Sequence, residues 1–227
     1  MSKIKIVGLA LAAILAMSAV TAGAASAASR VWVVKGATLG AGETRTMTAK
    51  TVAGKSWELK ASLITIKCTT MSITGGSAVG GTVGTDKGTV QFTGCSSNCG
   101  SKVVAEPIST LGTETELVEN TAKTKVLDLF KPNAKKEFAT IVASGCTPEK
   151  TTVEGENGVA AEISEEGVEK LTHVMKFPCP PITEALNSAG TKLALSLKAF
   201  GFITAEFCGE AEAELLNGVV KENWSVK

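Results

Sequence analysis

The amino-acid sequence predicts an all-β fold, an antiparallel β-sandwich or barrel of roughly 12 short strands stapled by disulfides. Threonine, valine and isoleucine recur in short alternating runs that glycine, asparagine and proline interrupt, as in strands joined by turns. Helical periodicity is missing, apart from one candidate helical turn at residues 182–187. The six cysteines are an even number, which indicates disulfide staples in an exported chain.

Residues 1–27 have the pattern of a signal peptide. Lys3 and Lys5 make a basic start, residues 6–20 are apolar, and small side chains follow to residue 29. Ala25-Ser26-Ala27 fits the small-x-small cleavage rule best, and the triplet one residue later fits nearly as well. The alternative is an amino-terminal anchor, but the apolar stretch is shorter than the ~20 residues that span a bilayer. We therefore expect a secreted protein, extracellular or at the cell envelope, without a membrane anchor after cleavage.

Residues 28–227 are expected to form a single all-β domain, with two packed β halves as the alternative arrangement. No linker long enough to divide this stretch is apparent in the sequence. A chain of this length can bury ~70% of its unfolded surface, so one substantial core is expected.

The first half of this domain alternates between predicted strands and turns. Trp57, Leu59 and Ala61 alternate with polar neighbours, but the apolar face switches at Leu63 and Ile64, which predicts a β-bulge. Residues 74–88 are rich in glycine and predict a long loop or a weak hairpin. The strands predicted in this half cover residues 31–34, 43–48, 57–61, 64–68, 89–93, 102–106 and 113–118.

The second half has the clearest strand patterns. Residues 171–177 place apolar side chains and His173 on one face, and the leucines of residues 193–199 alternate with polar residues. Asn217-Gly218 favours the positive φ of a tight turn, so residues 211–216 and 219–226 are expected to form a closing hairpin. The other strands predicted here cover residues 125–129, 138–143, 151–154, 159–163 and 202–207.

The charge balance excludes two classes of partner. The chain carries 23 basic and 22 acidic residues, and loss of Lys3 and Lys5 with the signal peptide changes the net charge from +1 to −1. Such a balance does not favour electrostatic capture of nucleic acid or of an anionic membrane. Arg30 and Arg45 are the only arginines, so the guanidinium forks that bind phosphate are almost absent.

The cysteines are predicted to form three intrachain disulfides. Cys68 and Cys95 flank residues 74–88, so a hairpin there would place them opposite each other and within bridging distance. Cys179 and Cys208 flank a later strand region, and a bridge between them follows by similar logic.

Cys99 and Cys146 are then left for each other. The main alternative exchanges Cys95 for Cys99, because only three residues separate these two. Metal binding is the other alternative. Cys95 and Cys99 are the only close pair, and no second pair or histidine has the spacing to complete a tetrahedral zinc site.

A spaced pattern of apolar residues and cysteines extends along most of residues 28–227. It comprises Trp32, Trp57-x-Leu59, Ile64-x-Ile66-x-Cys68, Phe92-x-x-Cys95, Leu127-x-Leu129-Phe130-Lys131-Pro132, Phe138, Ile141, Cys146, Val153-x-Gly155 and Trp224. In this pattern the chain resembles secreted, β-rich, cysteine-containing proteins of actinobacterial type. The resemblance implies secretion and a disulfide-bearing β fold, and it brings no activity, ligand or catalytic residue. Cys99, Cys179 and Cys208 fit the pattern less firmly.

Two short motifs have simpler structural explanations than catalysis. Residues 53–56 match the end of a phosphate-binding loop, but Ala49 stands where that motif requires glycine and a strand follows Ser56. A turn around Lys55 is therefore expected. His173, the single histidine, could act as a general base, but no nucleophile elbow exists in the sequence. We expect a hydrogen-bonded or edge histidine.

Glutamates and tryptophans supply the remaining candidates. Two carboxylates could hydrolyse a glycoside, but 20 glutamates make some close pair inevitable. The six glutamates of residues 154–169 could collect calcium, yet calcium loops prefer aspartate and asparagine, so a solvated acidic face is expected. Trp32, Trp57 and Trp224 could stack on sugars, but each lies in an apolar or alternating strand, which favours core packing.

The sequence favours a secreted, non-catalytic binding or structural module that contacts envelope glycan or another secreted protein. It identifies no catalytic, cofactor-binding or metal-ligating residue. The alternatives are a secreted glycan hydrolase that uses two glutamates and a secreted inhibitor or effector. A glycan module should expose aromatic side chains in a groove, and a hydrolase should face two glutamates across a cleft. An inhibitor should present a protruding, disulfide-braced loop, for which residues 95–99 are the best candidate.

Overall fold

The computed structural model describes residues 30–61, 64–99, 102–103, 105–112 and 114–227. These residues form 20 strands and contain no α-helix, so the predicted all-β class is confirmed. The strand number exceeds the expected one because the predicted runs 193–199 and 219–226 are each divided, and because residues 37–38, 108–109 and 184–186 form further short strands. All ladders between the named strands are antiparallel, and they close into a barrel structure.

Eight strands form a closed ring, which we call the first barrel. Their ladders follow the order β3–β5–β6–β9–β10–β13–β14–β18, and β18 returns to β3. The strands are β3 (Thr44–Thr51), β5 (Ile64–Val79), β6 (Thr85–Ser97), β9 (Glu114–Glu119), β10 (Val126–Phe130), β13 (Val159–Ile163), β14 (His173–Phe177) and β18 (Ile203–Asn217).

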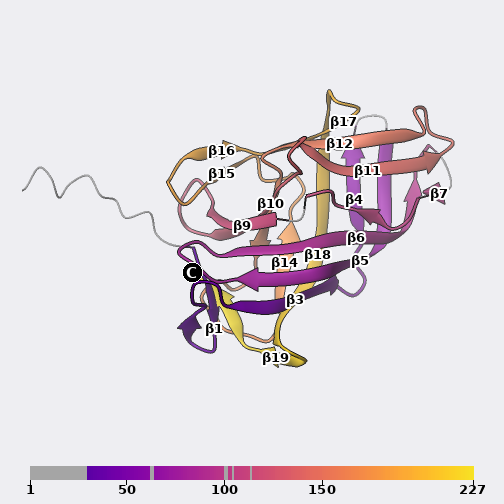
Figure 1. Cartoon of the computed structure of the whole chain (residues 1–227). Coiled ribbons are helices and arrows are strands. Elements are labelled where there is room, and N and C mark those ends of the chain that lie inside the picture. The colour runs from indigo at the N-terminus through magenta and orange to yellow at the C-terminus, as the bar shows by residue number, and fades with distance from the viewer. Residues whose placement is uncertain (1–29, 62–63, 100–101, 104, 113) are drawn as a thin grey trace, which may run out of the picture.

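A second ring, the second barrel, shares β5, β6 and β18 with the first. Its order is β4–β5–β6–β8–β11–β12–β17–β18, with β18 returning to β4 and a single bridge between Thr110 and Ala139 joining β8 to β11. Figure 1 shows β5 and β6 running side by side across the molecule. The further strands are β4 (Trp57–Ala61), β8 (Ile108–Ser109), β11 (Glu137–Ser144), β12 (Lys150–Glu156) and β17 (Ser196–Ala199).

The remaining strands close or decorate these rings. A three-stranded sheet in the order β2–β1–β20 contains the first and last described strands of the chain, and we call it the cap. In the cap, the Trp32 and Trp224 rings lie 5.6 Å apart and Trp32 Nε1 donates to the Thr85 carbonyl at 3.0 Å. The strands are β1 (Trp32–Val34), β2 (Ala37–Thr38), β7 (Lys102–Val103), β15 (Glu184–Leu186), β16 (Lys192–Ala194), β19 (Val220–Glu222) and β20 (Trp224–Val226).

The shared strands are long because glycines let them bend and pack closely. Residues 74–88 form a hairpin between β5 and β6, which confirms the hairpin option, and the register shifts between Thr74 and Ser77. Gly75 there has a φ of 66°, in the left-handed region that glycine adopts without strain. Gly209 on β18 lies against the Trp57 indole, and a Cβ atom at this position would overlap the ring.

Three local predictions were wrong. The apolar face switches near residue 64 because the chain reverses: β4 and β5 pair as a hairpin, with Trp57 opposite Cys68 and Leu59 opposite Ile66. Residues 62–63, where the β-bulge was expected, lie outside the described residues. The expected helical turn at residues 182–187 is strand β15, which pairs with β16. Residues 192–199 form two strands, β16 and β17, because Leu193 and Leu195 pack on a separate apolar cluster outside the first barrel.

Candidate functional site

The three disulfides join the predicted partners. Cys68 bridges Cys95, Cys99 bridges Cys146, and Cys179 bridges Cys208. The alternative that exchanged Cys95 and Cys99 is therefore wrong. Cys68 and Cys95 are direct cross-strand partners on β5 and β6, because the hairpin of residues 74–88 sets their register.

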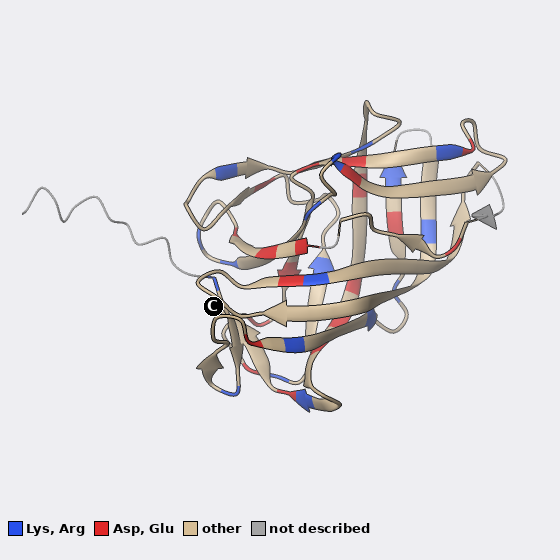
Figure 2. Ribbon diagram, viewed as in Figure 1, with Lys and Arg blue, Asp and Glu red and all other residues tan. Residues whose placement is uncertain are grey.

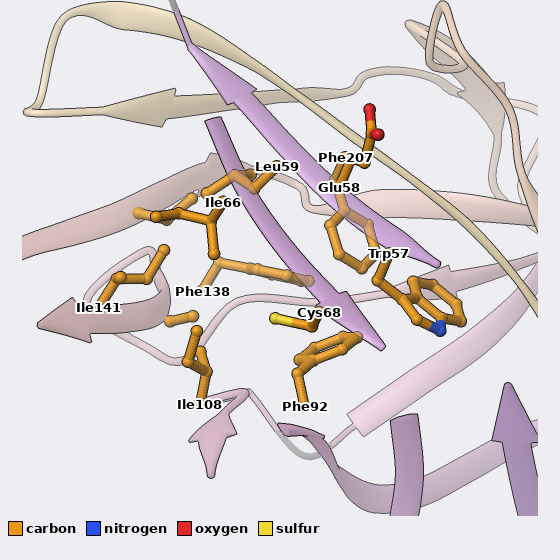
Figure 3. A pocket seen from close by; sticks show the side chains of 12 residues that line it. Trp57, Glu58, Leu59, Ile66, Cys68, Phe92, Ile108, Phe138, Ile141 and Phe207 are labelled. Carbon is orange, nitrogen blue, oxygen red and sulfur yellow. The ribbon is translucent and has the colours of Figure 1, made fainter. Parts of the chain in front are cut away.

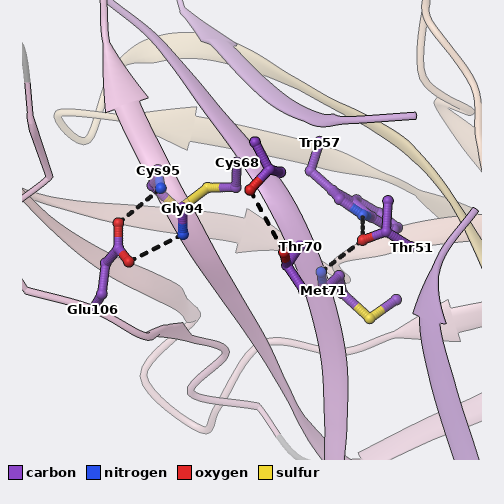
Figure 4. The surroundings of a disulfide bond; sticks show 9 residues. Thr51, Trp57, Cys68, Thr70, Met71, Gly94, Cys95 and Glu106 are labelled. Atoms are coloured by element: carbon purple, nitrogen blue, oxygen red, sulfur yellow. Dashed lines mark hydrogen bonds between the residues drawn. A yellow bond between two sulfur atoms is a disulfide. The ribbon is translucent and has the colours of Figure 1, made fainter. Parts of the chain in front are cut away.

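The Cys95–Cys68 bridge is reinforced from the opposite side. Both carboxylate oxygens of Glu106 accept backbone amides, from Gly94 at 3.0 Å and from Cys95 at 2.7 Å (Figure 4). Two charge-assisted hydrogen bonds thus hold this part of β6 in addition to its ladder with β5. Cys95, the first residue of the segment 95–99, is therefore held in a fixed position by its disulfide and by Glu106.

Residues 95–99 form a braced segment that runs from the buried Cys95, near the end of β6, to the exposed Asn98 and Cys99. A disulfide leaves each end, from Cys95 to Cys68 and from Cys99 to Cys146. Between them, Asn98 exchanges hydrogen bonds with Thr65: the Thr65 amide donates to Asn98 Oδ1 at 2.8 Å, and the Asn98 amide donates to the Thr65 carbonyl at 3.1 Å. Asn98 and Cys99 remain exposed. This is the disulfide-braced surface segment expected of an inhibitor-like module.

Other chain reversals lie at the same end of the second barrel, which we call the loop end. The registers place Ala61 and Ile64, the paired ends of β4 and β5, at the same end as residues 97–99, because Ile66 is opposite Ser97. The β11–β12 turn lies beside the β17–β18 turn, because β12 pairs with β17. Phe202, in the β17–β18 turn, is 78% exposed. The loop end thus combines a braced polar segment with an exposed aromatic ring.

The three tryptophans are core residues, as predicted. Trp32, Trp57 and Trp224 are each at most 2% exposed. Trp57 lies at the centre of an aromatic cluster with Phe92, Phe177 and Phe207, whose ring centroids lie 5.4 to 5.5 Å from its own. None of the three tryptophans offers a ring to a sugar at the surface.

The interior of the second barrel holds an apolar cavity of about 40 Å³ (Figure 3). Side chains from both walls line it, including Ile66, Phe92, Phe138 and Phe207. Glu58 is its one charged neighbour, and its carboxylate is held outside by Lys60 and Lys67, each at 2.8 Å. Small-molecule sites enclose roughly 300–1,000 Å³, so this cavity is a packing defect rather than a ligand site.

Lys55 and the glutamates of residues 154–169 lie at or near the surface. Lys55 lies in the β3–β4 turn and faces Glu210 at 3.4 Å, so the predicted turn is confirmed. Five of the six glutamates bind a partner: Glu156 pairs with Lys136, Glu162 with Lys125 and Glu165 with Lys170, while Glu166 and Glu169 accept backbone amides. Figure 2 shows charges of both signs interspersed along the strands. Three of these glutamates therefore form ion pairs and two accept backbone amides on a surface of mixed charge. Within the described residues, no three acidic, histidine or cysteine side chains gather as metal ligands.

Asp86 and Asp128, the only aspartates of the chain, form a buried pair that the sequence analysis missed. Asp86 lies on β6 between Ala78 and Thr115, and Asp128 lies on β10 opposite Leu117. The two side chains are 3% and 0% exposed, inside the first barrel. A signal was available: Asp128 interrupts the apolar run of residues 126–130 in a chain that otherwise uses glutamate.

Burial gives both aspartates raised pKa values. Loss of hydration raises the pKa of Asp86 to about 6, although Thr115 and Asp128 oppose the shift. Loss of hydration is also the largest cause for Asp128, whose pKa lies well above its ordinary value, and the Asp86 charge adds to it. The pair resembles the carboxyl dyads of acid–base enzymes in its chemistry, but neither side chain reaches a surface groove.

In comparisons with known proteins, no family model, curated protein or solved structure matches the chain. Within the described residues, no helix has the length and apolar character to cross a membrane.

Proposed function

We propose that this protein is a secreted, non-catalytic binding module that recognises another secreted or envelope protein through the loop end of the second barrel. The observation that supports the proposal is the placement of a doubly braced segment, residues 95–99, on a rigid β scaffold. Binding residues commonly lie on loops that a rigid scaffold positions, because a fixed loop loses little conformational entropy on binding.

The proposal favours a protein partner over envelope glycan. Sugar-binding grooves use exposed aromatic rings, whereas the three tryptophans of this chain are buried. Phe202 is the large aromatic side chain exposed among the described residues, and it stands at a turn rather than in a groove. An exposed aromatic side chain at the same end of the barrel as a braced polar segment favours a protein contact, because a few anchor side chains carry most of the binding energy of such contacts.

Secretion is the first testable part of the proposal. Ala25-Ser26-Ala27 is the best cleavage triplet, and Arg30, just beyond it, is buried and paired with Glu119. We expect the mature amino terminus at Ala28 or within two residues of it. Amino-terminal sequencing or intact mass of the exported protein measures this directly. An exported soluble form that retains Met1 would contradict the prediction.

Binding is tested with the purified mature chain on an array of secreted proteins and envelope glycans. For a protein that binds, we expect Phe202→Ala to weaken the interaction at least about tenfold, since buried aromatic anchors dominate such contacts. The matched control is Val219→Ala, another exposed apolar side chain, at the turn that follows the opposite end of β18.

Three outcomes contradict the proposal. Binding to glycans alone would assign the module to the envelope polysaccharide. Equal loss in both variants, or loss only in Val219→Ala, would move the contact away from the loop end. Release of reducing ends from a polysaccharide by the mature chain would instead identify a hydrolase.

A further inference from the structure

The first barrel buries every aspartate and the only histidine of the chain. Asp86, Asp128 and His173 are 3%, 0% and 1% exposed. These are the side chains whose ordinary pKa values lie in the acidic to neutral range, together with glutamate. The described glutamates, by contrast, lie mainly at the surface and face lysines. The two aspartates thus lie in one barrel interior, away from water.

The aspartate pair has no cation beside it. The cross-strand neighbours of Asp86 are Ala78 on β5 and Thr115 on β9. Those of Asp128 are Leu117 on β9 and Ala161 on β13, and none of the four is charged. Both carboxyl oxygens of Asp128 and Oδ2 of Asp86 lack a hydrogen-bond partner. Two adjacent ionised carboxylates in such surroundings would repel each other without compensation, so protonation is the form that the interior accommodates.

His173 joins the cap to the barrel. Nδ1 lies 2.7 Å from the carbonyl oxygen of Ser164, in the β13–β14 connection, and Nε2 lies 2.7 Å from the carbonyl oxygen of Trp224, on β20. The Trp224 ring lies 4.4 Å from the imidazole, centroid to centroid.

No described cation faces the aspartate pair. Arg30, at the amino-terminal end of the described chain, is paired with Glu119, and Arg45 and Lys35 both hold Glu222 on β19, at 2.6 and 2.7 Å. Burial and the lack of a compensating charge therefore act on both carboxyls together.

We propose that the first barrel is a proton-operated lock, closed at acidic pH by the protonated Asp86–Asp128 pair. Loss of the protons places repelling charge between β6 and β10 inside the barrel and loosens the ring there. The lock is independent of the binding function proposed for the loop end.

The direction of the pH effect follows from proton binding. A group with a raised folded-state pKa holds its proton more tightly in the folded state, so its contribution to stability is complete below the unfolded pKa. For the aspartates that limit is about 4. The contribution is lost as the pH rises through the folded values, about 6 for Asp86 and higher for Asp128. The pair therefore stabilises the fold most in acid, and its contribution is lost toward neutral and alkaline pH.

The wild-type mature chain gives the first test. We expect Tm to fall by at least about 5 °C between pH 5 and pH 8, where the paired glutamates stay ionised, and amide protection in β10 to fall over the same range more than in β12. A Tm that stays constant or rises toward pH 8, or equal changes of protection in β10 and β12, would overturn the proposal.

Variants assign the effect to its groups. Asp128→Asn places a neutral isostere in the barrel, and we expect it to remove at least half of the fall in Tm. Asp86→Asn is the second variant if the first does not fold. Glu162→Gln, which changes a partly exposed carboxyl on β13 beside Ala161, is the matched control and should keep the wild-type profile. An unchanged fall in both aspartate variants, or a flattened profile in Glu162→Gln, would refute the role of the pair.

Discussion

Replacement of Trp57 by alanine is expected to lower the free energy of unfolding by about 3–5 kcal/mol. Trp57 is 2% exposed and contacts three phenylalanine rings, on β6, β14 and β18. Its indole also fills the space beside Gly209, where the backbone of β18 approaches it closely. Alanine would leave a cavity that this close-packed cluster collapses into only partly, and the cavity adds to the lost apolar burial.

The loss of the indole also removes a hydrogen bond. Trp57 Nε1 donates to Thr51 Oγ1 at 3.1 Å, and the same oxygen accepts the Met71 amide at 2.6 Å (Figure 4). Thr51, at the end of β3, thereby links β4 to β5. The Trp57→Ala variant leaves this hydroxyl with one partner fewer, which adds to the destabilisation.

Urea unfolding of the mature chain measures the effect of Trp57→Ala, with the reading taken from far-ultraviolet circular dichroism because the variant loses a fluorophore. Phe202→Ala is the control, because it truncates an aromatic side chain that is 78% exposed, and it should change stability by less than about 0.5 kcal/mol. A loss below about 1 kcal/mol for Trp57→Ala would contradict the prediction that the aromatic cluster around Trp57 is a major source of stability.

Removal of the Cys68–Cys95 disulfide has the second largest expected effect. The bridge closes a loop with a sequence separation of 27 residues, which in the chain-entropy account stabilises the folded state by about 3.5 kcal/mol. Both cysteines are buried in the core of the second barrel, so the double variant Cys68→Ala/Cys95→Ala also loses apolar contacts. We expect the free energy of unfolding to fall by about 3–5 kcal/mol in total.

Equilibrium unfolding under non-reducing conditions measures this loss, and peptide mapping first verifies the three bridges in the wild type. The control is Lys67→Ala/Ser96→Ala, the neighbouring cross-strand pair on the same two strands, whose side chains are exposed. Its expected change is below about 1 kcal/mol, since it gives up only the surface ion pair of Lys67 with Glu58. A double-cysteine variant as stable as this control would refute the assignment, as would free thiols at Cys68 and Cys95.

Local patterns predicted those features that depend on neighbours in sequence. Cys68 and Cys95 were assigned to each other because a glycine-rich stretch between two strands indicates a hairpin, and a hairpin sets its own register. The same stretch was too rich in glycine for its strand length to be predicted. β5 extends to Val79 and β6 starts at Thr85, because barrel closure extends both ladders beyond the residues whose alternation is visible.

The β4–β5 connection shows where local patterns mislead. A switch of apolar face at residues 63 and 64 is the same in a bulged strand and in two strands joined by a tight turn. Alternation has a period of two in either case, and the pairing partner is what distinguishes them. The ladder between Trp57 and Cys68 decides for the hairpin.

By itself the sequence determined the all-β class, most of the strands, the burial of the tryptophans and the three disulfide pairs, because alternation, turn residues and cysteine spacing are local signals. Only the tertiary structure decided that β5, β6 and β18 serve two barrels at once, that residues 95–99 lie at one end beside other turns, and that Asp86 and Asp128 share an interior. Asp86 and Asp128 are 42 residues apart in the chain, and Asp86 stands in a Thr-Asp-Lys-Gly stretch that is typical of a surface turn. Their meeting depends on ladders that link β6 through β9 to β10, and such non-local pairing leaves no pattern in the residues that surround either aspartate.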